Sequence, residues 1–301
     1  MELWIPITVF AAFMQNLRSA LQKHLKGQLS TGGASYVRFL YSWPFAMLWL
    51  WGVHEYTGYA LPAVNGTFLL YCALGGLMQI LFTFLLVYLF SFRNFAVGTV
   101  YSKTEIVQVA LLGLILLGDS VSALGVVAIV IGMIGIMVLS VAQTDVTWRN
   151  LVVSLFDKPA LIGLLSGAFL GASVVFFRGA ALALGDEAPI MRAAFALAVS
   201  VSMQTASMGL YLLWREKGQM TAVFKAWKPA GGVGLAAVMG SIGWFTAFAL
   251  QNAAYVRAVG QIELVFTFIA SVFFFKEKTN ALELTGIALV VAAILMLVLT
   301  H

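Results

Sequence analysis

Long apolar segments separated by short polar connections run along the whole chain. A helix that crosses a bilayer needs about 20 consecutive, mostly apolar residues. By that measure the pattern predicts ten membrane-spanning helices and no inserted soluble domain. The predicted spans cover residues 3–22, 34–53, 66–91, 97–117, 121–142, 160–183, 188–214, 231–250, 258–275 and 280–300. The expected fold class is therefore an all-α polytopic membrane protein, with a kink at Pro44 inside the second span.

Two of the apolar segments carry the same polar pattern. Val100–Asp119 and Ala258–Glu277 each hold one glutamate well inside the segment. Because five helices would cross the membrane an odd number of times, a second copy of a five-helix unit would be inverted relative to the first. In transporters, inverted repeats place the substrate site near the membrane midplane. The sequence predicts two inverted five-helix repeats, residues 1–148 and 149–301, in one transmembrane domain. The residue pairs that suggest the repeat lie 158 positions apart and are Glu105 and Glu263, Asp119 and Glu277, and Asn94 and Asn252.

Composition narrows the class of protein further. Of the 301 residues, 62% are hydrophobic and 10% are charged, whereas soluble proteins carry about 25% charged residues. The single cysteine, Cys72, excludes an intrachain disulfide and a thiolate metal cage. The three histidines lie near the predicted membrane edges, and the chain has no catalytic triad, phosphate loop or metal-ligand spacing. We therefore expect no enzyme activity, no cofactor, no metal and no nucleic-acid partner.

The distribution of basic residues predicts the orientation. Lysines and arginines gather in the odd-numbered connections, whereas the termini and the even-numbered connections carry little beyond Arg257. Connections that face the cytoplasm are enriched in these residues. We expect a multi-pass protein of the cell membrane, the inner membrane in a bacterium, with both termini outside the cytoplasm. Its partners would be the lipid bilayer and a small-molecule substrate, and the chain would act as a monomer or a homodimer.

The two intramembrane glutamates, Glu105 and Glu263, are the first candidates for function. A carboxylate at this depth is costly and by default marks a substrate or ion pathway. Burial favours the protonated form, so each glutamate could exchange a proton for a cationic or zwitterionic substrate. The alternative is a structural glutamate that is hydrogen-bonded to a neighbouring helix or paired with an arginine. Tyr101 and Gln108 share a helix face with Glu105, whereas Lys103 lies two residues away and points elsewhere.

Aromatic and amide side chains within the spans are further candidates. Trp43 and Trp244 lie deeper than the other tryptophans and either wall a pocket, stack on a cation, or pack against lipid and core. Asn16, inside the first span, either lines a cavity or bridges two helices.

Arginines near the span ends allow two interpretations. Arg18, Arg38, Arg178 and Arg192 either extend their side chains to the membrane interface or pair at helix ends. Alternatively, Arg38 or Arg192 holds a substrate carboxylate in a bidentate grip.

Several features together resemble the drug/metabolite transporter superfamily of the EamA type. They are the ten spans in two inverted repeats, the fourth and ninth helices that end in Gly-Asp or Lys-Glu, the glycine-bearing helices that follow at once, and the arginines that open the second and seventh helices, Arg38 and Arg192. The resemblance implies a basket of helices around a central cavity, alternating access, and export of amino acids, other metabolites or drugs, often with a proton gradient.

The sequence thus predicts a secondary active transporter that exports small polar metabolites, with protons as a candidate coupling ion. Glu105 and Glu263 would be the substrate or coupling carboxylates, and Gln108, Tyr101, Trp43 and Trp244 would line the cavity. One alternative is an anion carrier that binds an organic acid through its arginines. The other is a membrane sensor or assembly partner that transports nothing.

Overall fold

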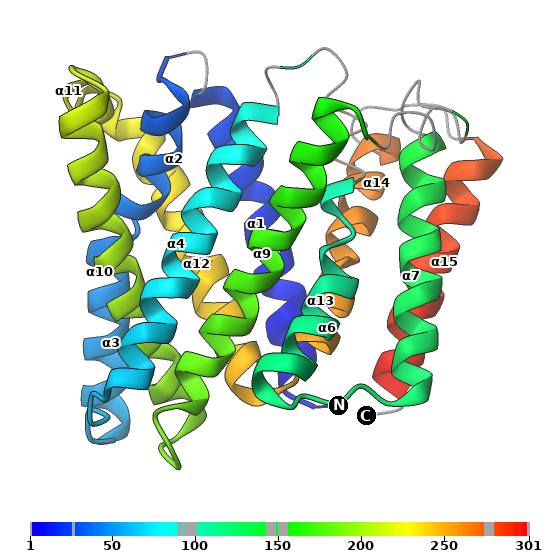
Figure 1. The fold of residues 1–301 in the computed structure, drawn as a ribbon, viewed down its shortest axis with the longest axis horizontal. Helices are drawn as coiled ribbons and strands as arrows, with labels where there is room; N and C mark the ends of the chain where they lie inside the picture. The colour runs from blue at the N-terminus through cyan, green and yellow to red at the C-terminus, as the bar shows by residue number, and fades with distance from the viewer. Residues whose placement is uncertain are drawn as a thin grey trace.

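The computed structural model describes residues 2–25, 28–89, 101–142, 156–273 and 280–299, together with residues 92 and 149. The elements within these ranges are α-helices that stand side by side in one bundle (Figure 1). They are α1 (Trp4–Leu25), α2 (Thr31–Leu40), α3 (Trp43–Thr57), α4 (Gly66–Leu89), α6 (Glu105–Leu117), α7 (Ala123–Ala142), α9 (Lys158–Leu182), α10 (Pro189–Arg215), α11 (Gln219–Lys225), α12 (Trp227–Leu250), α13 (Ala253–Gly260), α14 (Ile262–Phe273) and α15 (Ala281–Leu299).

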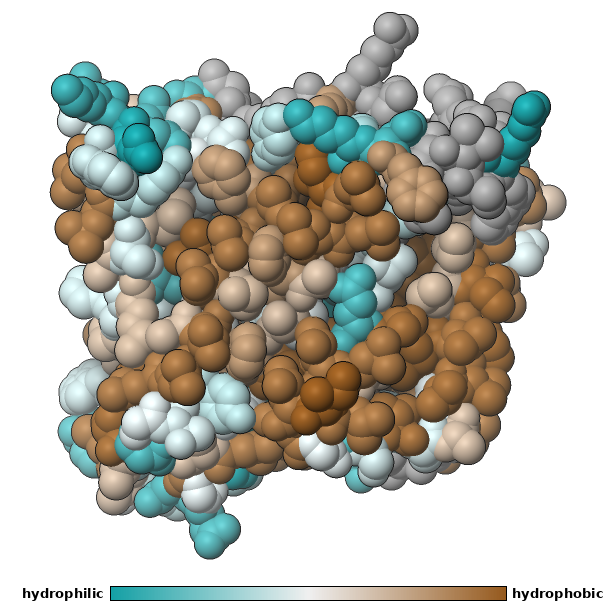
Figure 2. Space-filling view, viewed as in Figure 1, coloured by the Kyte–Doolittle hydropathy of each residue, from teal (hydrophilic) through white to brown (hydrophobic). Residues whose placement is uncertain are grey.

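The lengths and the surface of these helices are those of a multi-pass membrane protein. Six of the described helices, α4, α7, α9, α10, α12 and α15, are long and apolar enough to cross a bilayer. Large apolar side chains such as Trp214 and Leu213 are exposed on the outside of the bundle. Figure 2 shows a broad hydrophobic band across the middle of the molecule, with hydrophilic residues gathered along its upper and lower edges. This surface matches a hydrocarbon environment rather than water.

Two of the predicted spans are each divided into two helices, and a third, 97–117, is interrupted by a turn at Lys103 and Thr104, directly before α6. The segment 34–53 consists of α2 and α3, which are separated at residues 41–42, directly before Pro44 in the first turn of α3. The predicted kink is therefore confirmed, because proline removes an N–H from the helix ladder and clashes with the preceding turn. The segment 258–275 begins with α13, which ends at Gly260, and continues as α14. That second interruption was not predicted.

Three pairs of long helices form the most extensive contacts of the bundle. They are α4 with α9, α1 with α12, and α7 with α15. Close approach between α7 and α15 depends on Gly286, where an added Cβ would lie 2.7 Å from the backbone N of Leu139. At Gly167 of α9, an added Cβ would lie 2.8 Å from the carbonyl oxygen of Ser102. This second contact holds the segment that leads into α6 close to α9.

The two ends of the bundle differ in charge. The end at which α1 finishes and α9 starts, at the top of Figure 1, carries exposed basic residues. They include Lys158, Arg215, Lys217, Lys225 and Lys228. At the opposite end, α1 starts and α15 finishes, so both ends of the described chain lie on the same side (Figure 1). The sequence predicts that the end richer in basic residues faces the cytoplasm, and that end is the upper one here. The orientation in the membrane stays a prediction.

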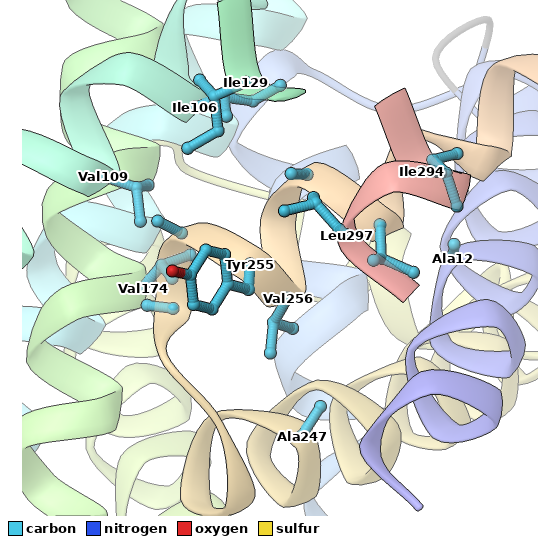
Figure 3. Packing of buried hydrophobic residues seen from close by; sticks show 14 of the residues in the cluster. Ala12, Ile106, Val109, Ile129, Val174, Ala247, Tyr255, Val256, Ile294 and Leu297 are labelled. Carbon is cyan, nitrogen blue, oxygen red and sulfur yellow. The ribbon is translucent and has the colours of Figure 1, made fainter. Parts of the chain in front are cut away.

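An apolar core fills the region between α13 and the surrounding long helices. Figure 3 shows Tyr255 and Val256 of α13 among side chains from α1, α6, α7, α9, α12 and α15. The Tyr255 hydroxyl accepts a hydrogen bond from the backbone N of Ser122, in the connection between α6 and α7, at 2.8 Å. The short helix α13 is therefore fixed by packing and by a polar contact, and its position determines where Arg257 points.

Candidate functional site

A polar cavity lies inside the apolar bundle and consists of three adjoining hollows that share Phe82. We name them for characteristic lining residues. The arginine hollow measures about 270 Å³ and is lined by Asn16, Arg18, Ser19, Ala20, Gln22, Ala34, Arg38, Phe82, Thr83, Leu86 and Val87. The glutamate hollow measures about 250 Å³ and is lined by Gln15, Asn16, Arg18, Ser19, Phe82, Leu86, Ser102, Lys103, Glu105, Leu170, Arg257, Glu263 and Leu264. The tryptophan hollow, about 30 Å³, includes Gln15, Arg38, Gln79, Trp244 and Arg257.

The first charged pair of the cavity joins Glu105 and Arg257. Glu105 opens α6 and Arg257 lies in α13, and a guanidinium N–H of Arg257 donates to Glu105 Oε1. The side chains are 2% and 4% exposed. Arg257 also lies over the ring of Trp244, with its Cζ 4.8 Å from the ring centroid. Among the described residues, the second carboxylate oxygen of Glu105 has no hydrogen-bond partner.

The second charged pair joins Lys103 and Glu263. Lys103 Nζ lies 2.5 Å from Glu263 Oε1, and the amide of Gln15 donates to Glu263 Oε2 at 3.0 Å. The side-chain amide of Asn16 donates to the backbone carbonyl of Glu263 at 3.4 Å. Side chains from α1 and from the turn before α6 therefore hold this carboxylate, and its side chain is 12% exposed. Arg257 lies close enough for its charge to interact with Glu263 as well as with Glu105.

Arg18 of α1 and Arg38 of α2 face the arginine hollow. They are 7% and 8% exposed, and Arg38 lies close enough to Arg18 for their like charges to interact. The Nη2 of Arg18 donates to the hydroxyl of Ser19 at 3.1 Å, and the Nη1 of Arg38 donates to the hydroxyl of Thr83 at 3.2 Å. Neither guanidinium belongs to an ion pair formed within the described residues.

The charged side chains that line the arginine and glutamate hollows do not balance. Four are cationic, and they are Arg18, Arg38, Lys103 and Arg257. Two, Glu105 and Glu263, are anionic. The two residues of each ion pair, Glu105–Arg257 and Lys103–Glu263, neutralise each other. The two remaining positive charges belong to Arg18 and Arg38.

A separate polar cluster fastens the opposite end of the bundle. Arg178, near the end of α9, holds Asp119 after α6 through two hydrogen bonds of 2.5 and 3.0 Å. The same guanidinium donates to the carbonyl oxygens of Phe248 and Gln251 at 2.8 and 2.6 Å. One side chain therefore ties α9 to the connection after α6 and to the end of α12. The predicted pairing of Arg178 at a helix end is confirmed.

The structure brings together five of the nine residues selected from the sequence. Glu105, Glu263, Asn16, Arg38 and Trp244 line the cavity. Four do not line its three hollows. Trp43 is 43% exposed and donates to the hydroxyl of Ser202 at 2.9 Å, Gln108 donates to Thr104 Oγ1 at 3.0 Å, Arg192 donates to the carbonyl of Gly185 at 2.9 Å, and Tyr101 is half-buried before α6.

Two sequence interpretations were wrong. Arg18 and Arg38 do not extend to the membrane interface, because neighbouring helices enclose both side chains. Arg257 is not an exposed connection residue, because it lies in α13 and is 3% exposed. Its flanking residues, Ala-Ala-Tyr-Val before it and Ala-Val after it, are the signal that it is buried. Of the pairs that suggested the repeat, Asn94 and Glu277 lie outside the described residues.

Comparison with known proteins identifies the architecture. Residues 157–299 match the model of the EamA-like transporter family. The match covers 143 of the 301 residues, so it is the second half of the chain that resembles this family. The EamA-like family is part of the drug/metabolite transporter superfamily, whose members are membrane transporters.

A solved structure, described as "Crystal structure of protein", has the same fold. It superposes on this chain with a TM-score of 0.71, covering 99% of this chain and 96% of its own, at 14% sequence identity. No curated protein matches the sequence.

Proposed function

We propose that this protein is a membrane transporter and that it carries a small polar metabolite through the central cavity by alternating access. The observation that carries the proposal is a cavity lined by six charged side chains in the middle of an apolar bundle. Buried charge in a membrane protein is costly and is retained along substrate and ion pathways. A sensor or assembly partner would gain nothing from hollows totalling several hundred Å³ inside its core.

The pairing of the long helices supports an internal two-fold relation between residues 1–148 and 149–301. If each half contributes five spans, α1 and α9 are the first spans and α4 and α12 are the third. The first span of each half then packs along the third span of the other, as α1 with α12 and α9 with α4, and the fifth spans α7 and α15 pack on each other. An exchange of the halves preserves all three pairings, as inverted repeats require.

The position of the cavity supports one state of an alternating-access cycle. The arginine hollow includes Gln22, near the end of α1, and Ala34, near the start of α2, so it extends toward the basic end of the bundle. At the other end, Arg178 and its partners close the space between helices. If the basic end faces the cytoplasm, this is an inward-open state, and release of Arg178 accompanies the outward-open state.

Glu263 is our candidate for proton coupling. It is paired with Lys103 yet partly exposed to the glutamate hollow, so a proton can reach it from water in the cavity. Protonation would release Lys103 and change the charge that the cargo meets. The family resemblance favours export as the direction of transport.

Transport by reconstituted full-length protein tests the proposal. Proteoliposomes are screened with amino acids, organic acids and sugar phosphates, first by exchange across the membrane and then with an imposed proton gradient. We expect Glu263→Gln to abolish gradient-driven accumulation while exchange continues. Glu283→Gln is the matched control, because Glu283 is half-buried in the first turn of α15 and does not line the three hollows. Gradient-driven transport at the wild-type rate by Glu263→Gln would refute the coupling role.

A thiol-accessibility assay tests the pathway without any knowledge of the cargo. After Cys72→Ala, Ser19→Cys places a thiol on the lining of both large hollows. We expect a membrane-impermeant reagent to label it from the basic face. Ser173→Cys is the control and should stay unlabelled, because Ser173 of α9 is fully buried. A Ser19→Cys thiol that reacts from neither face would favour a non-transporting protein.

A further inference from the structure

We propose that Arg18 and Arg38 form the binding site for the cargo, and that the cargo is a small organic anion with two negative charges. Dicarboxylates and phosphate monoesters share this chemistry. The inference rests on the proposed transport function and names its substrate class.

Both guanidiniums are enclosed by the protein, and their hydrogen bonds use only part of their donors. Both side chains are more than nine-tenths buried, and the hydrogen bonds that hold them are to neutral hydroxyl groups, those of Ser19 and Thr83. The Nε of Arg18 has no hydrogen-bond partner among the described residues. An arginine offers five N–H donors in a planar fork that matches carboxylate and phosphate oxygens. Much of this donor capacity remains unused in the arginine hollow.

The other two buried arginines provide an internal contrast. Arg178 is saturated by Asp119 and two backbone carbonyls, and Arg257 is paired with Glu105 and lies over Trp244. In both cases the fold supplies the anion. For Arg18 and Arg38, the described part of the chain supplies neither a paired carboxylate nor separation of the two like charges. Burial of a charged group that belongs to no ion pair is unfavourable, and a bound anion would form an ion pair with both groups together.

Charge and volume define the ligand. The two large hollows carry four cations and two carboxylates, so a ligand with two negative charges makes the lining neutral. The arginine hollow measures about 270 Å³, which corresponds to roughly nine water volumes of about 30 Å³ each. It therefore suits a metabolite of about ten non-hydrogen atoms. Phe82, Leu86 and Val87 line the same hollow and provide an apolar wall for the carbon skeleton.

Ligand-induced thermal stabilisation of the purified full-length protein tests the inference. A ligand that binds the folded state raises the unfolding midpoint by linkage. The probes are dicarboxylates of increasing length starting from succinate, and phosphate monoesters starting from glycerol 3-phosphate. Succinamide is the neutral isostere of succinate and putrescine is the cationic counterpart. All probes are compared at equal concentration and ionic strength.

We expect dianions to raise the midpoint and the two control probes to leave it unchanged. Which series stabilises more distinguishes a carboxylate cargo from a phosphate cargo. Arg18→Gln and Arg38→Gln should each weaken dianion binding about 10- to 100-fold, since each removes a charge-assisted grip on the ligand. Arg215→Gln is the matched control because Arg215 is exposed at the end of α10, and it should bind as the wild type does.

A structural role for the two arginines predicts a different result. If Arg18 and Arg38 only stabilised the fold, their replacement by glutamine would lower the midpoint without ligand. If instead the two arginines form a binding site, their like charges repel each other when the site is empty. The replacement then leaves the unfolding midpoint without ligand unchanged or raises it. Arg18→Lys keeps the charge but not the planar fork, and should recover part of the affinity that Arg18→Gln loses.

Failure of this inference can be told apart from failure of the proposed function. Dianion binding of equal strength in the wild type, Arg18→Gln and Arg38→Gln would overturn the two-arginine site, as would stabilisation by putrescine or succinamide alone. Absence of stabilisation by any dianion would also overturn it. In each of these cases, labelling of Ser19→Cys from the basic face would still stand as evidence for the transport pathway.

Discussion

Neutralising Glu105 should destabilise the protein more than neutralising Glu263, the other glutamate of the cavity. Glu105→Gln leaves the Arg257 guanidinium buried at 4% exposure without its counterion. Breaking such a buried pair by removal of one partner costs about 3–5 kcal/mol. Trp244 and Glu263 still face the guanidinium, and a cation–π contact retains about 0.5–2 kcal/mol. We therefore expect a loss near the lower end, about 3 kcal/mol in the free energy of unfolding.

A double-mutant cycle isolates the interaction between the two charges. Arg257→Gln alone leaves Glu105 buried without its counterion, just as Glu105→Gln does for Arg257. Both single variants should therefore unfold at a lower temperature than the wild type. The double variant places two amides of similar size at the same site and should recover most of the loss, because no buried charge is left. Glu263→Gln is the comparison within the cavity. Its pair with Lys103 is more exposed, at 12% and 24%, and its loss should cost less.

Thermal unfolding of the detergent-solubilised protein, followed by tryptophan fluorescence, measures these differences. At about 2–4 °C for each kcal/mol, Glu105→Gln should lower the midpoint by roughly 6–12 °C. Size-exclusion chromatography confirms that each variant is monodisperse before it is heated. An unchanged midpoint in both single variants would refute the argument that Glu105 and Arg257 stabilise each other. A double variant that is no more stable than either single variant would do the same.

Three further predictions, which involve four substitutions, test other parts of the structure. Arg178→Ala should cost about 2–3 kcal/mol, since its hydrogen bonds to a carboxylate and two carbonyls are lost, and thermal unfolding checks this loss. Gly234→Ala should cost about 1–3 kcal/mol, because the added Cβ would lie 2.6 Å from a backbone carbon of Tyr41, the C-cap of α2. At Gly231 an added Cβ meets nothing within 4 Å, so Gly231→Ala should be neutral or stabilising by up to about 1 kcal/mol. Thermal unfolding ranks the two variants, and the reverse order would contradict the packing. Glu263→Gln should tighten dianion binding about 10-fold at neutral pH, because the substitution removes a negative charge that attracts Arg18. It should also flatten the pH dependence of dianion binding. Binding titrations across pH measure both effects, and an unchanged pH profile would contradict the prediction.

The hydrophobic pattern predicted the fold class well and the interruptions poorly. Span length follows from the thickness of the bilayer, so apolar segments could be located from composition alone. A break of one or two residues leaves the mean hydropathy of a segment almost unchanged. The break before α3 was visible only because Pro44 marks it, whereas the break at Gln261 has no proline and is marked only by the glycine before it, Gly260. The inverted repeat remains a prediction that the helix pairings favour.

Within the site, both anionic residues were selected from the sequence, whereas of the four cationic residues only Arg38 was, as one of two interpretations. A glutamate inside an apolar run, such as Glu105 or Glu263, has a short side chain and no means of reaching water, so its position alone marks it. Arginine and lysine side chains are long enough to reach the interface from several turns inside the membrane. Whether Arg18 points to lipid headgroups or into a cavity therefore depends on the helices that pack around it, which the sequence alone does not specify.

The charges of the cavity form a connected network rather than two independent pairs. Arg257 interacts with both glutamates, and Arg18 is attracted by Glu263 and repelled by Arg257. Glu263 is thus the common neighbour of the buried ion pair and of the two-arginine hollow. A proton on Glu263 would make the lining more positive and favour an anion beside Arg18, whereas loss of that proton would favour release. In the proposed transporter, this shared carboxylate would link proton movement to cargo binding without direct contact between Glu263 and the cargo.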